Sequence, residues 1–180
     1  RPNSVILWTR LAPEPLQGGG MPVGSAQVRY RVCSDEAMRN TLQDGVAETS
    51  DAKGHSVHVR IEGLKPGREY FYQFYYGDEE SPVGRTRTSS PDDASAKIAL
   101  AYCQHYETGR YAAYRDMADW LPDCVIHTGD YIYEGGVSPL GAKMRDVGGG
   151  ERRLFEIVRQ HDGNEITSLW DYRNRYALYR

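Results

Sequence analysis

The chain has 180 residues, of which 39% are hydrophobic and 26% are charged, and its formal net charge is −3. These values indicate a globular protein with room for one ordinary domain or two small ones. The charge gives no electrostatic reason to expect nucleic acid as a partner, and no apolar run approaches the roughly 20 residues that would span a bilayer.

The ends and the cysteines add two expectations. The chain begins directly before a predicted strand and stops inside a predicted helix, so we expect it to be part of a longer protein. Cys33, Cys103 and Cys124 lie far apart in the sequence and indicate no disulfide framework. We expect Cys33 and Cys124 to be packed thiols of the core.

Residues 1–93 are predicted to form an all-β domain. Short apolar or alternating stretches are separated by Gly, Pro, Asn and Asp clusters, with no convincing helix among them. Leu64, Pro66 and Tyr70 match the spacing of a tyrosine corner, in which the phenol bonds back to the upstream backbone. This half therefore resembles a fibronectin type III-like sandwich.

Residues 94–180 are predicted to open an α/β layer. The apolar run at 96–103 indicates a strand buried on both faces, 109–121 has the apolar spacing of a helix, and 123–130 indicates a second buried strand. Strand, helix and strand within about thirty residues form a βαβ unit.

The remaining stretch is predicted to be Gly-rich and then helical. The basic cluster of Arg152, Arg153 and Arg159 is interleaved with glutamates, which is typical of a solvated helix face. Ser168 and Asp171 fit a capping box that starts a closing helix, with Leu169, Tyr172, Tyr176 and Tyr179 along one stripe.

Three side chains with metal-binding chemistry follow the two strands of the second half. Cys103 ends the first strand, and Asp130 and Tyr133 follow the second. If the strands are parallel neighbours, their carboxyl ends deliver these groups to one edge of the sheet. A phenol with a pKa near 10 becomes a ligand only of a strongly Lewis-acidic ion, and a thiolate favours a transition metal. The residue types therefore predict an Fe(III) site, with Asp130 free to bridge a second, harder cation.

Several long stretches support one family resemblance. Residues 102–136, "YCQHYETGRYAAYRDMADWLPDCVIHTGDYIYEGG", resemble the opening of the metallophosphatase domain in the alkaline phosphatase D (PhoD) family. "NSVILWTRL" and "GLKPGREYFYQFYYG" resemble the small β domain that precedes it, and residues 162–180 are similar to the helical segment that follows. The match runs in the same order over nearly the whole chain.

The resemblance implies a calcineurin-like α/β fold and hydrolysis of phosphate mono- and diesters by metal-activated hydroxide. It implies Fe(III) and Ca²⁺ as cofactors, with Cys103, Asp130 and Tyr133 in the positions of the iron-binding cysteine, bridging aspartate and iron-binding tyrosine. It also implies a secreted or cell-envelope protein exported by the twin-arginine pathway. The family's later ligands lie in segments that this chain does not contain, so we expect the chain alone to be inactive.

Two histidines lie close in the sequence to the candidate ligands. His127, on the second strand, and His105, two residues after Cys103, are predicted to lie beside the metal rather than to bind it.

The alternative to an enzyme is a non-catalytic binding module, in which the tyrosine-rich β domain recognises an envelope or protein partner. The sequence does not identify the preferred ester or the oligomeric state.

Overall fold

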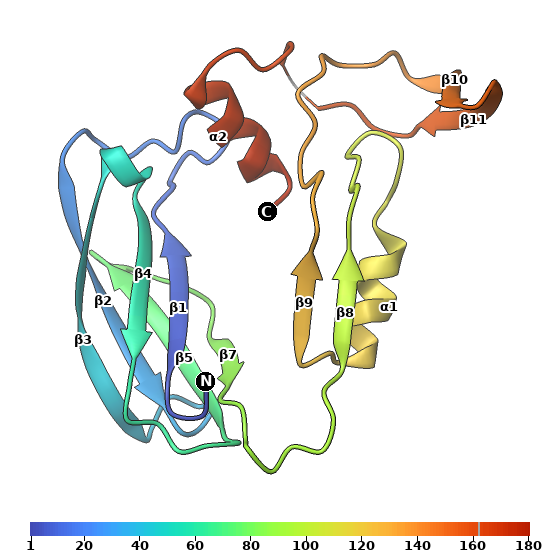
Figure 1. Ribbon diagram of the computed structural model, residues 1–180. Coiled ribbons are helices and arrows are strands. Elements are labelled where there is room, and N and C mark those ends of the chain that lie inside the picture. Colours follow the sequence, from blue (N-terminus) through green and yellow to red (C-terminus); the bar gives the residue numbers. More distant parts are fainter. Residues whose placement is uncertain (162) are drawn as a thin grey trace. The chain divides into compact units, whose positions relative to one another are not determined.

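The computed structural model describes residues 1–161 and 163–180, without the side chains of residues 143 and 147. The chain divides into two compact units. One comprises Arg1–Glu14 and Gly19–Ala94, and the other comprises Pro15–Gly18 and Ser95–Arg180. Figure 1 shows the elements of each unit. As predicted, the first is mostly β and the second is a small α/β part.

The first unit contains two antiparallel sheets. One pairs β1 (Val5–Arg10) with β4 (Ser56–Ile61). The second has five strands in the order β3-β2-β5-β6, with β7 also paired to β5. Its strands are β2 (Ser25–Cys33), β3 (Thr41–Ser50), β5 (Glu69–Tyr76), β6 (Glu79–Glu80) and β7 (Gly84–Arg87). A short 3₁₀ turn, η1 (Asp51–Lys53), joins β3 to β4.

Alternation along the strands builds the core of this unit. Val28 and Val32 on β2 are fully buried, while Gln27 and Arg29 between and beside them are exposed. The same period of two places alternate residues of β4 in the core. The buried cluster consists of Leu7, Val28, Val32, Val57, Val59, Ile61, Leu64, Tyr70 and Phe74. Cys33 is also buried, as expected.

The predicted tyrosine corner is present. The Tyr70 hydroxyl accepts a hydrogen bond from the Lys65 amide at 2.8 Å and donates to the Lys65 carbonyl at 3.3 Å. The hydroxyl of Thr88, which is 0% exposed, donates to the same carbonyl at 2.7 Å. The turn between β4 and β5 is therefore fixed to the core through one phenol and one hydroxyl.

The second unit opens with the predicted βαβ arrangement. Strands β8 (Ile98–Ala101) and β9 (Cys124–His127) are parallel, and α1 (Ala112–Trp120) connects them (Figure 1). The expectation that both strands are buried on both faces is wrong. Leu100 is 64% exposed, and Val125 and Cys124 are exposed as well. The reason is that, within the described residues, these two strands form a sheet by themselves, with no further strand beside them.

A β hairpin replaces the helix predicted after the Gly-rich stretch. Strands β10 (Gly141–Gly148) and β11 (Glu151–Ile157) pair antiparallel. Three successive glycines, Gly148, Gly149 and Gly150, have φ values of 94°, 62° and 78°, which side chains with a Cβ rarely adopt and a tight turn requires. The basic cluster is therefore not a helix face. Arg152 is exposed on a strand, and Arg159 lies against aromatic rings.

The closing helix begins as predicted. In α2 (Leu169–Leu178), the Ser168 hydroxyl accepts from the Asp171 amide at 3.2 Å. The Asp171 carboxylate in turn accepts from the Ser168 amide at 2.9 Å. The predicted apolar stripe is wrong in part, because Leu169 is 65% exposed and the buried residue of this helix is Arg175.

The tyrosine corner yields a stability prediction. Tyr70→Phe removes the hydroxyl through which the buried Tyr70 ring accepts from the Lys65 amide in a part-buried hydrogen bond, so the free energy of unfolding should fall by about 1 kcal/mol or more in urea denaturation. Tyr76→Phe, which removes the hydroxyl of a partly exposed ring from the same strand, is the control and should change the free energy by less than about 0.5 kcal/mol. Equal effects of the two substitutions would contradict the role assigned to the corner.

Candidate metal centre

The two loops that follow β8 and β9 leave the sheet at the same edge. Ala101 and His127 are partners in the parallel register, so the chains turn away side by side. Backbone hydrogen bonds then continue between the loops. Thr128 donates to the Ala101 carbonyl at 2.9 Å, Cys103 to that of Gly129 at 3.2 Å, and Gln104 to that of Asp130 at 3.1 Å. The residues that carry the candidate ligands are thus held together by their main chains.

Both loops have an unusual backbone at the candidate ligands. Cys103 has a φ of 53° and Asp130 a φ of 50°, in the left-handed region that residues with a Cβ seldom occupy. Such conformations persist only where surrounding interactions impose them, and they cluster at functional sites. The loop-to-loop hydrogen bonds described above supply that restraint.

The structure brings Cys103, Asp130 and Tyr133 together. The Cys103 thiol lies 3.2 Å from Oδ2 of Asp130, and the Tyr133 hydroxyl donates to the same oxygen at 3.1 Å. Cys103 and Asp130 are exposed, and Tyr133 is partly exposed. We call these three side chains the Cys-Asp-Tyr corner. Its solvent-facing position leaves it open to an incoming ion or substrate.

The spacing of the corner fits a shared cation. Two donors that bind one ion at about 2.0–2.3 Å, with an angle of about 90° between them at the ion, lie about 3 Å from each other. The distances from Oδ2 of Asp130 to the Cys103 sulfur and to the Tyr133 oxygen, 3.2 Å and 3.1 Å, are close to this value. Among the described residues, no three His, Cys, Asp or Glu side chains gather in a way that would hold a metal. A site at this edge therefore depends on the phenol as its third donor.

The surroundings of the Tyr133 phenol favour its protonated form when no metal is bound. Burial raises its pKa above the ordinary value of a tyrosine, and its hydrogen bonds with Cys103 and Asp130 add to the shift. The phenol donates its hydrogen bond to the Asp130 carboxylate, and a cation bound by the corner would take the place of that proton.

The two predicted neighbouring histidines have different surroundings. The ring of His105 lies 5.0 Å from that of Tyr133, and its Nδ1 accepts from the Glu107 amide at 3.3 Å. Burial lowers the pKa of His105, and the charge of Arg145 adds to this. The ring of His127 instead packs edge-on against Tyr131 at 5.1 Å. His105 is thus beside the corner, whereas His127 faces the tyrosines.

The sequence analysis did not anticipate a buried polar cluster next to the corner. Glu107 is 2% exposed, accepts from the Ser138 amide at 2.9 Å and lies 3.8 Å from Nε2 of His161. Arg159 stacks over the ring of Tyr106 at 4.0 Å. Nothing in the local sequence distinguishes these charged residues from solvated ones, because their partners lie far along the chain.

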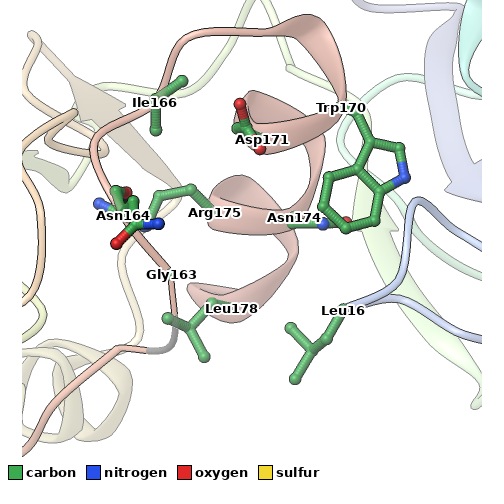
Figure 2. A pocket seen from close by; sticks show the side chains of 9 residues that line it. All are labelled: Leu16, Gly163, Asn164, Ile166, Trp170, Asp171, Asn174, Arg175 and Leu178. Carbon is green, nitrogen blue, oxygen red and sulfur yellow. The ribbon is translucent and has the colours of Figure 1, made fainter.

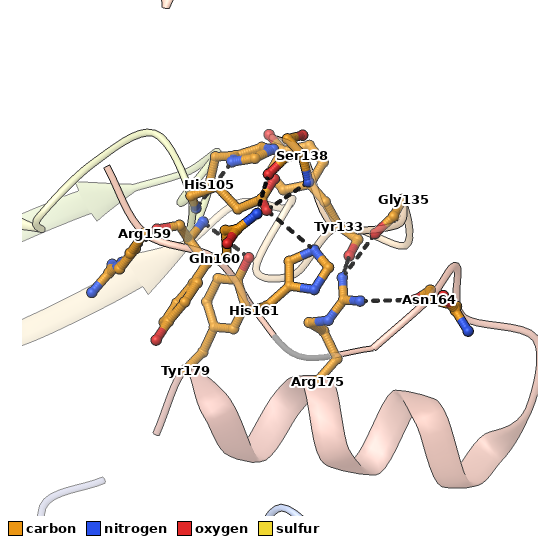
Figure 3. A network of polar contacts seen from close by, with 12 residues as sticks. His105, Tyr133, Gly135, Ser138, Arg159, Gln160, His161, Asn164, Arg175 and Tyr179 are labelled. Carbon is orange, nitrogen blue, oxygen red and sulfur yellow. Dashed lines mark hydrogen bonds and ion pairs between the residues drawn. The ribbon is translucent and has the colours of Figure 1, made fainter. Parts of the chain in front are cut away.

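Arg175 is the member of this cluster that reaches the corner. Its guanidinium, which extends from α2 in Figure 3, donates to the carbonyl oxygens of Tyr133 at 2.5 Å, Gly135 at 3.2 Å and Asn164 at 3.1 Å. A pocket of ≈ 220 Å³ opens here, lined by His105, Glu107, Tyr133, Glu134, Gly135, Gly136, Ser138, Arg145, His161, Arg175 and Tyr179.

A second pocket of the same unit, of ≈ 230 Å³, is also lined by residues of α2 and includes Trp170, Asn174 and Leu16 (Figure 2). Its two charged lining residues are already engaged, Asp171 in the helix cap and Arg175 with backbone carbonyls. We therefore find no chemistry in this pocket comparable with that of the corner.

Comparison with known proteins places the chain in a family. The family "PhoD-like phosphatase, N-terminal domain" matches residues 1–90, and "PhoD-like phosphatase" matches residues 98–180. The chain is 44% identical to "Alkaline phosphatase D" of Bacillus subtilis (strain 168) over 181 residues, covering 99% of this chain and 29% of that protein.

A solved structure agrees with this assignment. The one titled "Structure of PhoD" matches with a TM-score of 0.84 and 43% identity over 99% of this chain and 33% of its own. The chain therefore spans about a third of the length of these relatives. No helix among the described residues is both long and apolar enough to cross a bilayer. The chain belongs to the PhoD-like phosphatase family, of which it spans the N-terminal domain and the start of the phosphatase domain.

Proposed function

We propose that this chain is the N-terminal part of a metal-dependent enzyme that hydrolyses phosphate mono- and diesters, and that Cys103, Asp130 and Tyr133 hold its Fe(III). The observation that carries the proposal is the Cys-Asp-Tyr corner, in which a thiol and a phenol lie 3.2 Å and 3.1 Å from one carboxylate oxygen. Membership in a phosphatase family supports the reaction class.

The donor set favours iron over the common hard cations. Mg²⁺ and Ca²⁺ prefer shells made entirely of oxygen, so the Cys103 sulfur argues for a transition metal at this position. The Asp130 carboxylate has two oxygens and can serve two cations at once. We propose Ca²⁺ as the second kind of ion, which Asp130 would help to hold and which would supply further positive charge beside the phosphate.

When bound, such cations stabilise the negative charge that develops on the phosphate and make water a better nucleophile. The chain's own residues position the ligands and keep the site accessible. The loop-to-loop hydrogen bonds fix the ligands at the sheet edge, and the exposure of Cys103 and Asp130 leaves room for a phosphate with one or two ester groups. No protein nucleophile is needed.

The chain alone is proposed to be inactive. It covers 29% of the length of the Bacillus subtilis relative, and the three donors of the corner do not fill the coordination shells of several cations. Further ligands would come from outside these residues. Export by the twin-arginine pathway to the cell envelope or medium stays a prediction that rests on the family resemblance.

The first test is the composition and activity of the full-length protein. Elemental analysis should find iron together with calcium, and the protein should hydrolyse both p-nitrophenyl phosphate and bis(p-nitrophenyl) phosphate. A chelator should abolish both activities, because the charge stabilisation comes from the ions. A protein without iron or any other transition metal and without activity on either ester would favour the alternative of a non-catalytic binding module.

The second test addresses the phenol. An iron-bound phenolate gives a charge-transfer absorption in the visible region, so the full-length protein should be coloured and Tyr133→Phe should lose the colour. The substitution should also lower kcat by about 100-fold or more, since even residues that only support metal ligands often matter 10- to 100-fold. Tyr102→Phe, at an exposed tyrosine beside Cys103, should keep both properties. A coloured and fully active Tyr133→Phe protein would exclude the phenol as a ligand.

A further inference from the structure

We infer that Arg175 is a positioning residue for the metal corner, because its buried guanidinium fixes the backbone of the loop that carries the Tyr133 phenol. The inference rests on the proposed function, since the position of this loop matters for catalysis only if Tyr133 is a ligand. Arg175 lies 42 residues after Tyr133 in the chain, so α2 would control a site formed by β8 and β9.

The partners of Arg175 are backbone groups of two loops. Nη1 donates to the carbonyls of Tyr133 and Gly135, and Nη2 donates to that of Asn164 (Figure 3). A hydrogen bond to a backbone carbonyl oxygen constrains the main chain whatever side chain the residue carries. The guanidinium therefore acts on the path of the loop rather than on one side chain of it.

Burial makes this restraint strong. Arg175 is 5% exposed, and a charged group withdrawn from water is costly unless its hydrogen-bonding groups are satisfied. Any movement of residues 133–135 away from Arg175 would leave the guanidinium short of acceptors. Hydrogen bonds to charged groups contribute more than neutral ones, so the loop and the helix hold each other in place.

Two further contacts act on the same loop. The Tyr172 hydroxyl, one turn before Arg175 on α2, donates to Oε1 of Glu134 at 3.2 Å. The Glu134 carbonyl accepts from the Ile166 amide at 2.9 Å. These contacts place residues 133–135 between α2 and the segment before it. Tyr172 is exposed, so its hydrogen bond to Glu134 is expected to restrain the loop less than the hydrogen bonds of the buried Arg175 do.

Arginine is required at this position by geometry. Its planar fork presents several N–H groups in fixed directions, and they reach three carbonyls that are spread over two loops. A lysine ammonium is a single point charge on a flexible stem and cannot span the same acceptors. Arg175→Lys should therefore retain the charge but loosen the loop.

The decisive experiment is hydrogen exchange on the metal-free full-length protein. The amides of Ser138 and Ile166 are reporters, because each is bonded within this loop arrangement but not to Arg175 itself. In Arg175→Gln, their exchange should accelerate by about tenfold or more, and in Arg175→Lys by less, while exchange of the β2 and β5 amides stays unchanged. Arg152→Gln, which removes an exposed arginine from β11, is the matched control and should leave all of these rates unaltered.

Two outcomes would overturn the inference. Unchanged exchange at both reporter amides would show that Arg175 does not restrain the loop, and a uniform increase over the whole chain would show a general loss of stability instead. If Arg175→Gln does not fold, Arg175→Lys supplies the same comparison.

The metal-loaded enzyme links the restraint to catalysis. Arg175→Lys should shift or weaken the visible band and lower kcat by about 10- to 100-fold, with a smaller change in KM, because the Arg175 guanidinium is buried and bonded to backbone carbonyls. A loosened loop with an unaltered band and kcat would overturn the positioning role. A full-length protein that lacks iron and activity without any substitution would instead refute the proposed function, while leaving the exchange result to stand by itself.

Discussion

The parallel register of β8 and β9 is the constraint on which the candidate site depends. Because Ala101 pairs with His127, both chains leave the sheet at one level, and hydrogen bonds between the loops carry the pairing three residues further. Cys103 and Asp130 then lie opposite each other with the sulfur 3.2 Å from the carboxylate. A shift of the register by one residue would turn alternate side chains to the other face and separate the two donors.

The site also contains the features that a stable fold usually avoids. Cys103 and Asp130 adopt left-handed backbone conformations, and a charged arginine is buried against the backbone of the loop that carries Tyr133. Proteins tend to break such local rules at functional positions and to compensate through surrounding contacts. Here, main-chain hydrogen bonds between the loops stabilise the left-handed conformations, and three carbonyl acceptors stabilise the buried charge of Arg175. The strain and its compensation occur at one edge of one small sheet.

Local patterns in the sequence predicted what depends on neighbouring residues. The alternation on β2, the tyrosine corner at Tyr70, the βαβ unit and the cap at Ser168 all involve residues close together in the chain, and all were found. The meeting of Cys103 with Asp130 was also predictable, because the ends of parallel strands converge by geometry.

Features that depend on pairing or packing with another segment were missed or mistaken. The segment of β11, after the Gly-rich stretch, was predicted to be helical, since its charged residues at short spacing are compatible with a helix or a strand, and it is the pairing with β10 across the three-glycine turn that makes it a strand. Cys124 was expected in the core but is exposed, because burial depends on what covers a strand and not on the strand itself. Nothing in the local sequence marks Arg175 for burial, because the carbonyls that surround it lie up to 42 residues away.

In the proposed site, one iron ion is bound by the sulfur of Cys103 together with Asp130 and Tyr133. X-ray absorption at the iron edge of the full-length protein tests it most directly. Iron in this site should have one sulfur neighbour at about 2.3 Å, with oxygen neighbours closer in, and should lose that sulfur in Cys103→Ser. A shell of oxygen and nitrogen neighbours alone, or a sulfur that persists in Cys103→Ser, would contradict it.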